Sequence, residues 1–239
     1  MKFVKTAFEQ LPLGAVKPSG WLKDQLMIQA KGLTGHLEEH WADVGPENGW
    51  IGGSGESWER GPYYLDGLLP LAYLLEDERL IAKANRWVEW SLASQQDDGH
   101  FGPKRIETVN REVDKKHDWW HYMIMLKVMM QHEEATKDER IVPFLTKFFG
   151  YVRSTIEENP LQGWAKTRGA EMLLCLVWLY KRRRILCCWK WRRSWPSRRR
   201  TGLTFFTTSR SGARWRSGTG RRMWSMWRWG SRRRAFCTN

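Results

Sequence analysis

The feature that most constrains the fold is an internal echo between two helix-like segments. YLLEDERLIAKANRWVEW (73–90) is echoed by ATKDERIVPFLTKFFGYV (135–152), and the DER triplets at Asp77 and Asp138 are 61 residues apart. Apolar residues recur at helical spacing around each triplet, so each copy is a pair of helices joined by a short turn. Because a repeated hairpin buries its apolar face only against neighbouring hairpins, the echo predicts an all-α protein.

The periodicity also predicts where the individual helices lie. A first helix is expected from Ser19 to the left-handed position favoured by Gly32, with Trp21, Leu22, Leu26 and Ile28 at helical spacing. Residues 33–57 are expected to form a long loop. Helices are then expected over 62–75, from Asp77 onward, over 118–135 and over 138–156. A third hairpin begins at Gly163, with the apolar stripe Leu173, Leu176, Val177 and Tyr180.

A glycine-rich loop leads into the first hairpin. Gly52, Gly53 and Gly55 are followed by the polar and aromatic triplet 58–60 and by Pro62, which suits the first turn of a helix. The free N–H groups and the dipole of such a helix start attract hydroxyls and anions. The loop is therefore predicted to carry functional side chains to a binding site.

Each hairpin opens with aromatic and charged residues, and these are the candidate binding residues. They are Trp58, Glu59, Arg60, Trp119, Trp120, His121, Trp164 and Arg168. If the first helices form an inner ring, their starts converge at one mouth, as in an α/α toroid. A plain α-solenoid with tryptophans in its core fits the same pattern.

Each candidate has a structural alternative. Tryptophan faces stack on sugar rings, but they also pack in cores. Glu59 and Arg60 could bind sugar hydroxyls or form a buried ion pair between loop and helix. His117 and His121 are four residues apart, as in some zinc sites, although no third ligand is evident; a hydrogen-bonding role for His121 in the cleft is favoured. The acidic residues Glu133, Glu134, Asp138 and Glu139 are expected to form a solvated turn.

The charge divides the chain into two compositions. Residues 1–181 carry 22 Lys and Arg against 26 Asp and Glu, whereas residues 182–239 carry 18 Lys and Arg and no acid. Only Cys175 lies in the first part, so no disulfide framework is implied and a reducing, cytoplasmic location is expected. Neither a secretory signal nor an apolar run of membrane-spanning length is evident.

Several long segments resemble one enzyme family. PSGWLKDQLMIQAKGLTGHL (18–37), WERGPYYLDGLLPLAYLLEDERLIAKA (58–84), LASQQDDGHFGPK (92–104) and WAKTRGAEMLLCLVWLYKR (164–182) resemble the β-L-arabinofuranosidase-like glycoside hydrolases of family 127 and its relatives. The resemblance covers about 15–182. It implies a carbohydrate substrate and part of an (α/α)6 toroid with a sugar-binding cleft at the inner-helix ends, followed in complete members by β-sandwich domains.

The family's chemistry is not carried over by this resemblance. Its characterised members cleave non-reducing-end sugars with a cysteine nucleophile held near zinc, and a glutamate serves as acid/base. Those positions fall later in the barrel, and no segment here matches the glutamate–cysteine motif; Cys187 and Cys188 have no acid nearby. No catalytic residue, metal ligand or cofactor is therefore assigned to this chain, although zinc is expected in the complete family domain.

Residues 183–239 read like a shifted frame. Tryptophan and methionine have one codon each, so a frame shift can be tested on MWSMWRWG (223–230) and LCCWKW (186–191). The shifted codons give a valine-rich run that resembles the family and an amphipathic segment that would extend the third hairpin. The same tail, as written, has no helical or strand period and no compensating acid, so it is predicted to be disordered.

The predicted organisation is a family-127-like catalytic segment over 1–182 and an Arg/Trp-rich, out-of-frame tail over 183–239. The leading functional hypothesis is a truncated, inactive glycoside hydrolase. One alternative is a non-catalytic carbohydrate-binding fragment. Another is a polyanion or nucleic-acid binder acting through the tail, where arginine grips phosphates and tryptophan stacks on bases. The oligomeric state is left open.

Overall fold

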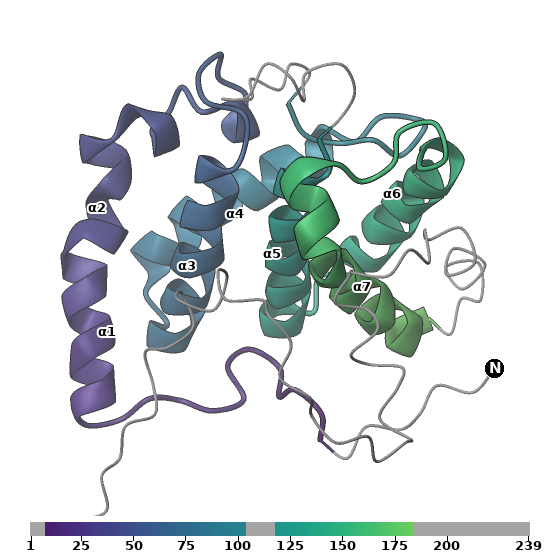
Figure 1. Ribbon diagram of the computed structural model, residues 1–239. Coiled ribbons are helices and arrows are strands. Elements are labelled where there is room, and N and C mark those ends of the chain that lie inside the picture. Colours follow the sequence, from purple (N-terminus) through teal and green to yellow (C-terminus); the bar gives the residue numbers. More distant parts are fainter. Residues whose placement is uncertain (1–7, 104–117, 184–239) are drawn as a thin grey trace, which may run out of the picture. The chain divides into compact units, whose positions relative to one another are not determined.

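The computed structural model describes residues 8–103 and 118–183, and within these ranges all regular structure is helical (Figure 1). The all-α prediction is thus confirmed for the described residues, none of which lies in a strand. The α-helices are α1 (Trp21–Lys31), α2 (Leu33–His40), α3 (Arg60–Leu75), α4 (Glu78–Ala93), α5 (Trp120–Thr136), α6 (Ile141–Thr155) and α7 (Gly163–Arg183), with short 3-10 turns at Ala42–Val44 (η1) and Gly49–Ile51 (η2).

The sequence echo corresponds to a repeated turn. The turn between α3 and α4 passes through Glu76 at φ 57°, and the turn between α5 and α6 passes through Lys137 at φ 61°. These two left-handed residues are 61 residues apart and each precedes an aspartate. Asp77 accepts the N–H of Leu80 at 3.1 Å, and its side chain thereby caps α4. The predicted pair of like hairpins is therefore present in the backbone.

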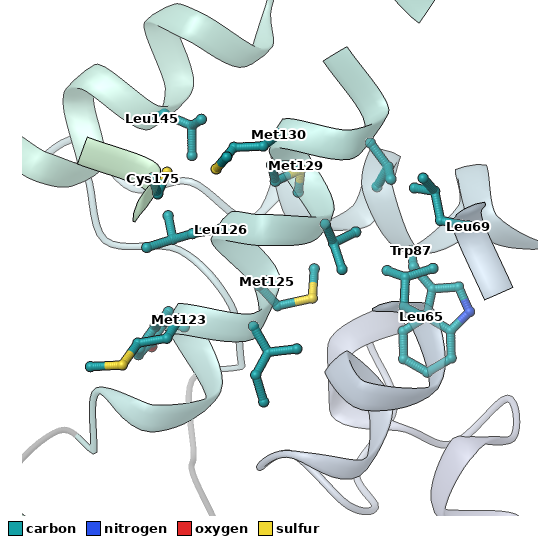
Figure 2. Close-up of a cluster of buried hydrophobic side chains, with 14 of the residues drawn as sticks. Leu65, Leu69, Trp87, Met123, Met125, Leu126, Met129, Met130, Leu145 and Cys175 are labelled. Atoms are coloured by element: carbon teal, nitrogen blue, oxygen red, sulfur yellow. The ribbon is translucent and has the colours of Figure 1, made fainter. Parts of the chain in front are cut away.

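Helix α5 is the centre of the described core. It packs against α3, α6 and α7, and its first three turns are buried on almost every side. Figure 2 shows its side chains meeting Leu65 and Leu69 of α3 on one side, and Leu145 and Cys175 of α6 and α7 on the other. A helix that is apolar on all sides is typical of a protein interior. Helix α5 accordingly packs against a helix of each of the three hairpins.

The N-terminal region differs from the predicted long loop. Residues Leu33–His40 form α2, which follows α1 almost without a break. Gly32 has φ −95°, so it does not take the left-handed conformation predicted for it. A Cβ added at Gly35 would lie 1.8 Å from the carbonyl oxygen of Ala30. The two helices are therefore connected by a tight junction that only a glycine at position 35 permits.

Helix α1 exposes much of its apolar surface. The predicted helix is present, but Trp21 is 71% exposed and Ile28 is 62% exposed. Ala30 is its only buried residue. The helical spacing of these apolar residues predicted the helix correctly, yet it did not predict burial.

Helix α7 buries a stripe next to the predicted one. Its buried apolar residues are Ala165, Met172, Cys175, Leu176 and Leu179. Of the predicted stripe, only Leu176 is buried, whereas Leu173, Val177 and Tyr180 are half-buried. The helix is rotated by about one residue relative to the prediction, because it packs on both α5 and α6.

The acidic end of the second hairpin is not a simple solvated turn. Glu133 is buried and pairs with Arg182 in the last turn of α7, at 2.8 Å. Glu134 accepts the indole N–H of Trp178 at 3.0 Å. These contacts fasten the end of α7 to α5, which corrects the prediction for both glutamates.

The helices that open the three hairpins follow one another in space. Helix α3 packs on α5, and α5 packs on α7 (Figure 1). An α-solenoid and part of an α/α toroid would both place these three helices one after another. The toroid therefore stays a prediction. Across the described ranges, no helix combines the length and apolar character needed to cross a bilayer.

Candidate functional site

The glycine-rich loop before α3 is held by hydrogen bonds within itself. The N–H groups of Gly49, Gly53 and Gly55 donate to backbone carbonyls of the same loop, at 2.7–3.0 Å. The buried amide of Asn48 accepts the N–H of Trp50 at 2.7 Å and donates to the Glu56 carboxylate at 3.0 Å. The loop is therefore a folded unit and not an open anion cradle, because its N–H groups already have partners.

The start of α3 is capped by a glutamate of this loop. The Glu56 carboxylate accepts the N–H groups of Trp58, Arg60 and Gly61, at 3.0, 3.2 and 3.4 Å. Pro62 has no N–H to donate. The donors predicted to attract a ligand are thus occupied by a side chain whose charge also suits the helix dipole. The sequence-based reasoning missed Glu56, which lies four residues before the helix, outside the usual capping spacing.

Two tryptophans tie the starts of α3 and α5 together. The indole N–H of Trp58 donates to Asp118 at 2.7 Å, and the indole N–H of Trp120 donates to Glu59. The partners are 60 and 61 residues apart, which is the spacing of the hairpin echo. We call these two reciprocal bonds the cross-tie; it holds equivalent positions of the two hairpins against each other.

The ring of Trp120 is also the meeting point with α7. The guanidinium of Arg168 lies 5.1 Å from its centroid, a cation–π distance, and the ring of Tyr63 lies 5.9 Å away. Trp120 is buried by these neighbours. Side chains from α3, α5 and α7 therefore converge on one indole, and together with the cross-tie residues they form the helix-start cluster: Trp58, Glu59, Tyr63, Asp118, Trp120 and Arg168.

Burial raises the pKa values of two acidic groups in this cluster. Burial raises the pKa of Asp118 above its usual range, although the N–H of Trp120 and the indole of Trp58 oppose the shift. Burial likewise raises the pKa of Tyr63. The Asp118 carboxyl group, which accepts the indole N–H of Trp58, thus holds its proton more tightly than an exposed aspartate does.

The other predicted site residues have different environments. Arg60 pairs with Asp43 and lies over the ring of Trp41, so it braces the loop from outside. The predicted Glu59–Arg60 pair is replaced by Glu59 to Trp120 and Arg60 to Asp43. Arg60 thus ties the loop to the helix through a partly exposed pair with Asp43, and not through the buried pair given as the alternative.

Trp119 and His121 are core residues in this structure. Trp119 is buried and donates its indole N–H to the carbonyl of Asn159 at 2.8 Å. The ring of His121 is fully buried, with its centroid 4.2 Å from that of Tyr122 and 5.6 Å from that of Trp50. These two residues therefore belong to the core, where they pack on Tyr122. His117, the partner in the predicted histidine pair, lies outside the described residues.

Trp164 is the most accessible of the predicted tryptophans. It opens α7, is 53% exposed, and lies one turn before Arg168. Tyr63 and Arg168 are exposed as well, and Arg168 bonds Glu171 at 2.8 Å. We call the accessible side chains Tyr63, Trp164, Arg168 and Glu171 the helix-start surface. It offers two aromatic rings, one cationic donor and one carboxylate, which is a combination that can stack on and hydrogen-bond a polar ring.

A metal site does not form among the described residues. They contain no group of three or more His, Cys, Asp or Glu side chains placed to hold an ion. Cys175 is a buried core residue, and the other cysteines lie outside the described ranges. The zinc implied for complete family members therefore has no fitting ligand set in this part of the chain, and we derive no chemistry from it.

The fold and the cluster define a class: a protein of packed helical hairpins whose helix starts share one aromatic and acidic cluster. A family model described as the catalytic domain of β-L-arabinofuranosidase, glycoside hydrolase family 127, matches residues 31–202. The chain therefore belongs to this glycoside hydrolase family, as the sequence resemblance predicted. The matched range runs past the predicted boundary at residue 182. Neither a curated protein nor a solved structure matches the chain.

Proposed function

We propose that this chain is the sugar-recognition part of a family-127 glycosidase domain, and that it binds the non-reducing end of a glycan over the helix-start cluster. The observation that carries the proposal is the convergence of α3, α5 and α7 on Trp120. A shared cluster from three hairpins supports a functional surface, because stacking hairpins does not by itself require three polar helix starts to meet. Membership of a carbohydrate-active family supports the ligand class.

The residues of the helix-start surface suit a sugar. Trp164 and Tyr63 present aromatic faces to an apolar ring face, while Arg168 and Glu171 supply a donor and an acceptor for hydroxyl groups. Trp119, Trp120 and His121 are buried, so we assign them no direct contact with the sugar. Of the residues predicted from the sequence, Trp164 and Arg168 are thus the ones we assign to direct contact.

We further propose that the chain binds sugar without cleaving it. Glycoside hydrolysis ordinarily uses two carboxyl groups separated by either about 5–5.5 Å or about 6.5–9.5 Å, one on each side of the scissile bond. At this cluster Glu59 and Asp118 each hold an indole N–H of the opposite hairpin. Using either group as an acid or base would require the cross-tie to open.

Titration calorimetry of the full chain with L-arabinose, run beside a release assay on 4-nitrophenyl β-L-arabinofuranoside, tests both statements. We expect measurable binding without nitrophenol release. The variant Trp164→Ala should weaken binding about tenfold, since loss of one stacked ring costs about 1–2 kcal/mol. Trp21→Ala, which removes an exposed tryptophan of α1, is the matched control. Steady turnover would overturn the second proposal, and equal binding by both variants would overturn the first.

A further inference from the structure

A second hollow lies beside the glycine-rich loop and uses none of the helix-start cluster. It has a volume of about 1110 Å³ and lies between loop 49–57, the end of α4 and the turn 94–103. Trp90 and Tyr151 contribute aromatic side chains to its wall, and Ser54, Gln96 and Asp98 contribute polar ones. We infer that this pocket is an additional binding site for a neutral saccharide.

Both walls of the pocket are fixed by contacts behind them. Gly52 has φ +93°, and a Cβ at this position would lie 2.7 Å from the indole nitrogen of Trp90, so glycine lets the loop lie close to α4. On the opposite wall, His100 is held by the hydroxyl of Tyr122 at 2.7 Å. Gln95 donates to the carbonyl of Phe144 at 3.0 Å and so anchors the turn to α6. The pocket is therefore shaped before a ligand arrives.

The described lining of the pocket does not suit a phosphate ligand. Its described lining contains no lysine or arginine. The glycine N–H groups, which would bind phosphate in a nucleotide-binding loop, donate instead to carbonyls of residues 47–56. Among the described residues of the lining, nucleotides and sugar phosphates therefore find neither a cation nor a free row of N–H donors.

The groups that remain are those that recognise a polyhydroxylated ring. Asp98 uses one carboxylate oxygen to accept the N–H of His100 at 2.8 Å, and the Gln96 amide nitrogen lies 3.3 Å from the His100 ring. The second Asp98 oxygen, the Gln96 side-chain carbonyl and the Ser54 hydroxyl can accept hydrogen bonds from a ligand, and all three residues are exposed. Trp90 adds apolar ring surface and an indole N–H. Concave sites with aromatic walls and a few placed polar groups are the usual form of small-molecule pockets, whose volumes are about 300–1,000 Å³. The size here suits a short oligosaccharide.

The test uses the full chain with L-arabinose and arabinobiose as probes and inorganic phosphate as the comparison. Hydrogen–deuterium exchange is read separately on peptides covering 49–57 and 94–103, and on a peptide covering 160–168. We expect the disaccharide to protect the first two peptides and phosphate to protect neither. Absence of protection at 49–57 and 94–103 at millimolar sugar, or protection by phosphate, overturns the inference.

A matched pair of variants makes the test specific. Ala93 is exposed at the end of α4 and lines the pocket, so Ala93→Trp should fill it and weaken protection at least tenfold. Ala82 is exposed three turns earlier on the same face of α4, and Ala82→Trp should change nothing. Ser54→Trp blocks the pocket from the loop side and serves if Ala93→Trp fails to fold. Unchanged protection in a folded blocking variant counts against the pocket.

The two proposals can fail separately. Trp164→Ala lies in the helix-start surface and should leave protection at 49–57 unchanged, whereas Ala93→Trp should leave protection at 160–168 unchanged. If only the peptide at 160–168 responds to sugar, the pocket proposal falls and the proposed function stands. If only the peptides at 49–57 and 94–103 respond, the proposed function falls and the pocket proposal stands.

Discussion

At the scale of single residues, the two indole N–H groups of the cross-tie determine how the hairpin starts meet. Trp58 and Trp120 each carry one donor on a large apolar ring, so each can be buried and still satisfy a carboxylate. The sequence indicated that these aromatic and acidic residues belong to one mouth. It could not indicate which carboxylate each indole would choose, because both partners are about 60 residues away.

Replacing Trp120 with phenylalanine should destabilise the fold by roughly 1–3 kcal/mol, since Glu59 loses a buried donor. Urea unfolding measures this change. The double variant Trp120→Phe/Glu59→Ala should cost less than the sum of the single changes, because each single change already removes the same bond. Trp164→Phe, at an exposed position, should cost less than about 0.5 kcal/mol. Strict additivity in the double variant would contradict the bond.

A second residue-level prediction concerns acid stability. Bonds from Arg140 lower the pKa of Asp138 to about 2, and burial only partly opposes them. A lowered carboxyl pKa gives stability that is present above the unfolded value of about 4 and is lost as the pH falls towards 2. Asp138→Asn should therefore cost roughly 1 kcal/mol at pH 7, discounted for the exposed arginine, and progressively less below pH 4.

The control for this prediction is Asp97→Asn, which changes an exposed aspartate in the turn after α4. Its unfolding free energy should differ little from that of the parent protein across the same range of pH. A cost for Asp138→Asn that stays constant from pH 7 to pH 3 would show that the ion pair with Arg140 does not stabilise the fold.

At the scale of elements, burial on all sides makes α5 the least tolerant helix. Leu126 is fully buried between α5, α6 and α7, whereas Leu174 on α7 is 49% exposed. Leu126→Ala should cost about 2–5 kcal/mol, because it leaves a cavity that the packed neighbours fill only partly. Leu174→Ala should cost less than about 1 kcal/mol. Thermal unfolding compares them, and equal losses would contradict the central position of α5.

The helices also show which parts of the fold sequence periodicity can predict. The two complete hairpins were predicted within a few residues, since the DER triplets and their apolar flanks lie in long helices. Helix α2 was missed because it is short, contains Gly35 and has no strong apolar stripe. The stripe of α7 was placed one residue off, since its rotation depends on contacts with two other helices. Local pattern locates a helix, whereas packing decides which side it buries.

Within the site, the same reasoning found the aromatic and charged positions but not their roles. Trp119 and Trp120 were candidates either for stacking on sugar or for core packing, and both are buried. Glu56 was not singled out, although it satisfies the first N–H groups of α3. Its role depends on the loop folding back through Asn48, which is a tertiary contact that no local spacing encodes.

At the scale of the whole molecule, residues 183–239 differ from the rest of the chain in composition, because they are rich in arginine and contain no acidic residue. We propose that this tail is read out of frame, and sequencing the gene around codon 182 tests the proposal. The shifted frame is expected to continue into further family-like helices and a glutamate–cysteine motif. If that frame holds early stop codons and no such motif, the tail is a genuine part of the protein.

The tail also predicts polyanion binding, whatever its origin. It combines 18 Lys and Arg from residue 182 onward with no acid, so the chain should be retained on heparin and released by salt. Removing residues 184–239 should abolish retention and spare sugar binding. The cut is placed after Arg183 because Arg182 pairs with Glu133 and keeps α7 in place. Retention by the shortened chain would assign polyanion binding to the helical region instead.

The inward-directed N–H groups of the glycine-rich loop have a kinetic consequence. A loop that already satisfies its own donors does not need to close around a ligand. Association should therefore be a single step whose rate rises linearly with ligand concentration, without the plateau that a slow rearrangement imposes. Differences in affinity among sugars would then lie in how quickly each one leaves.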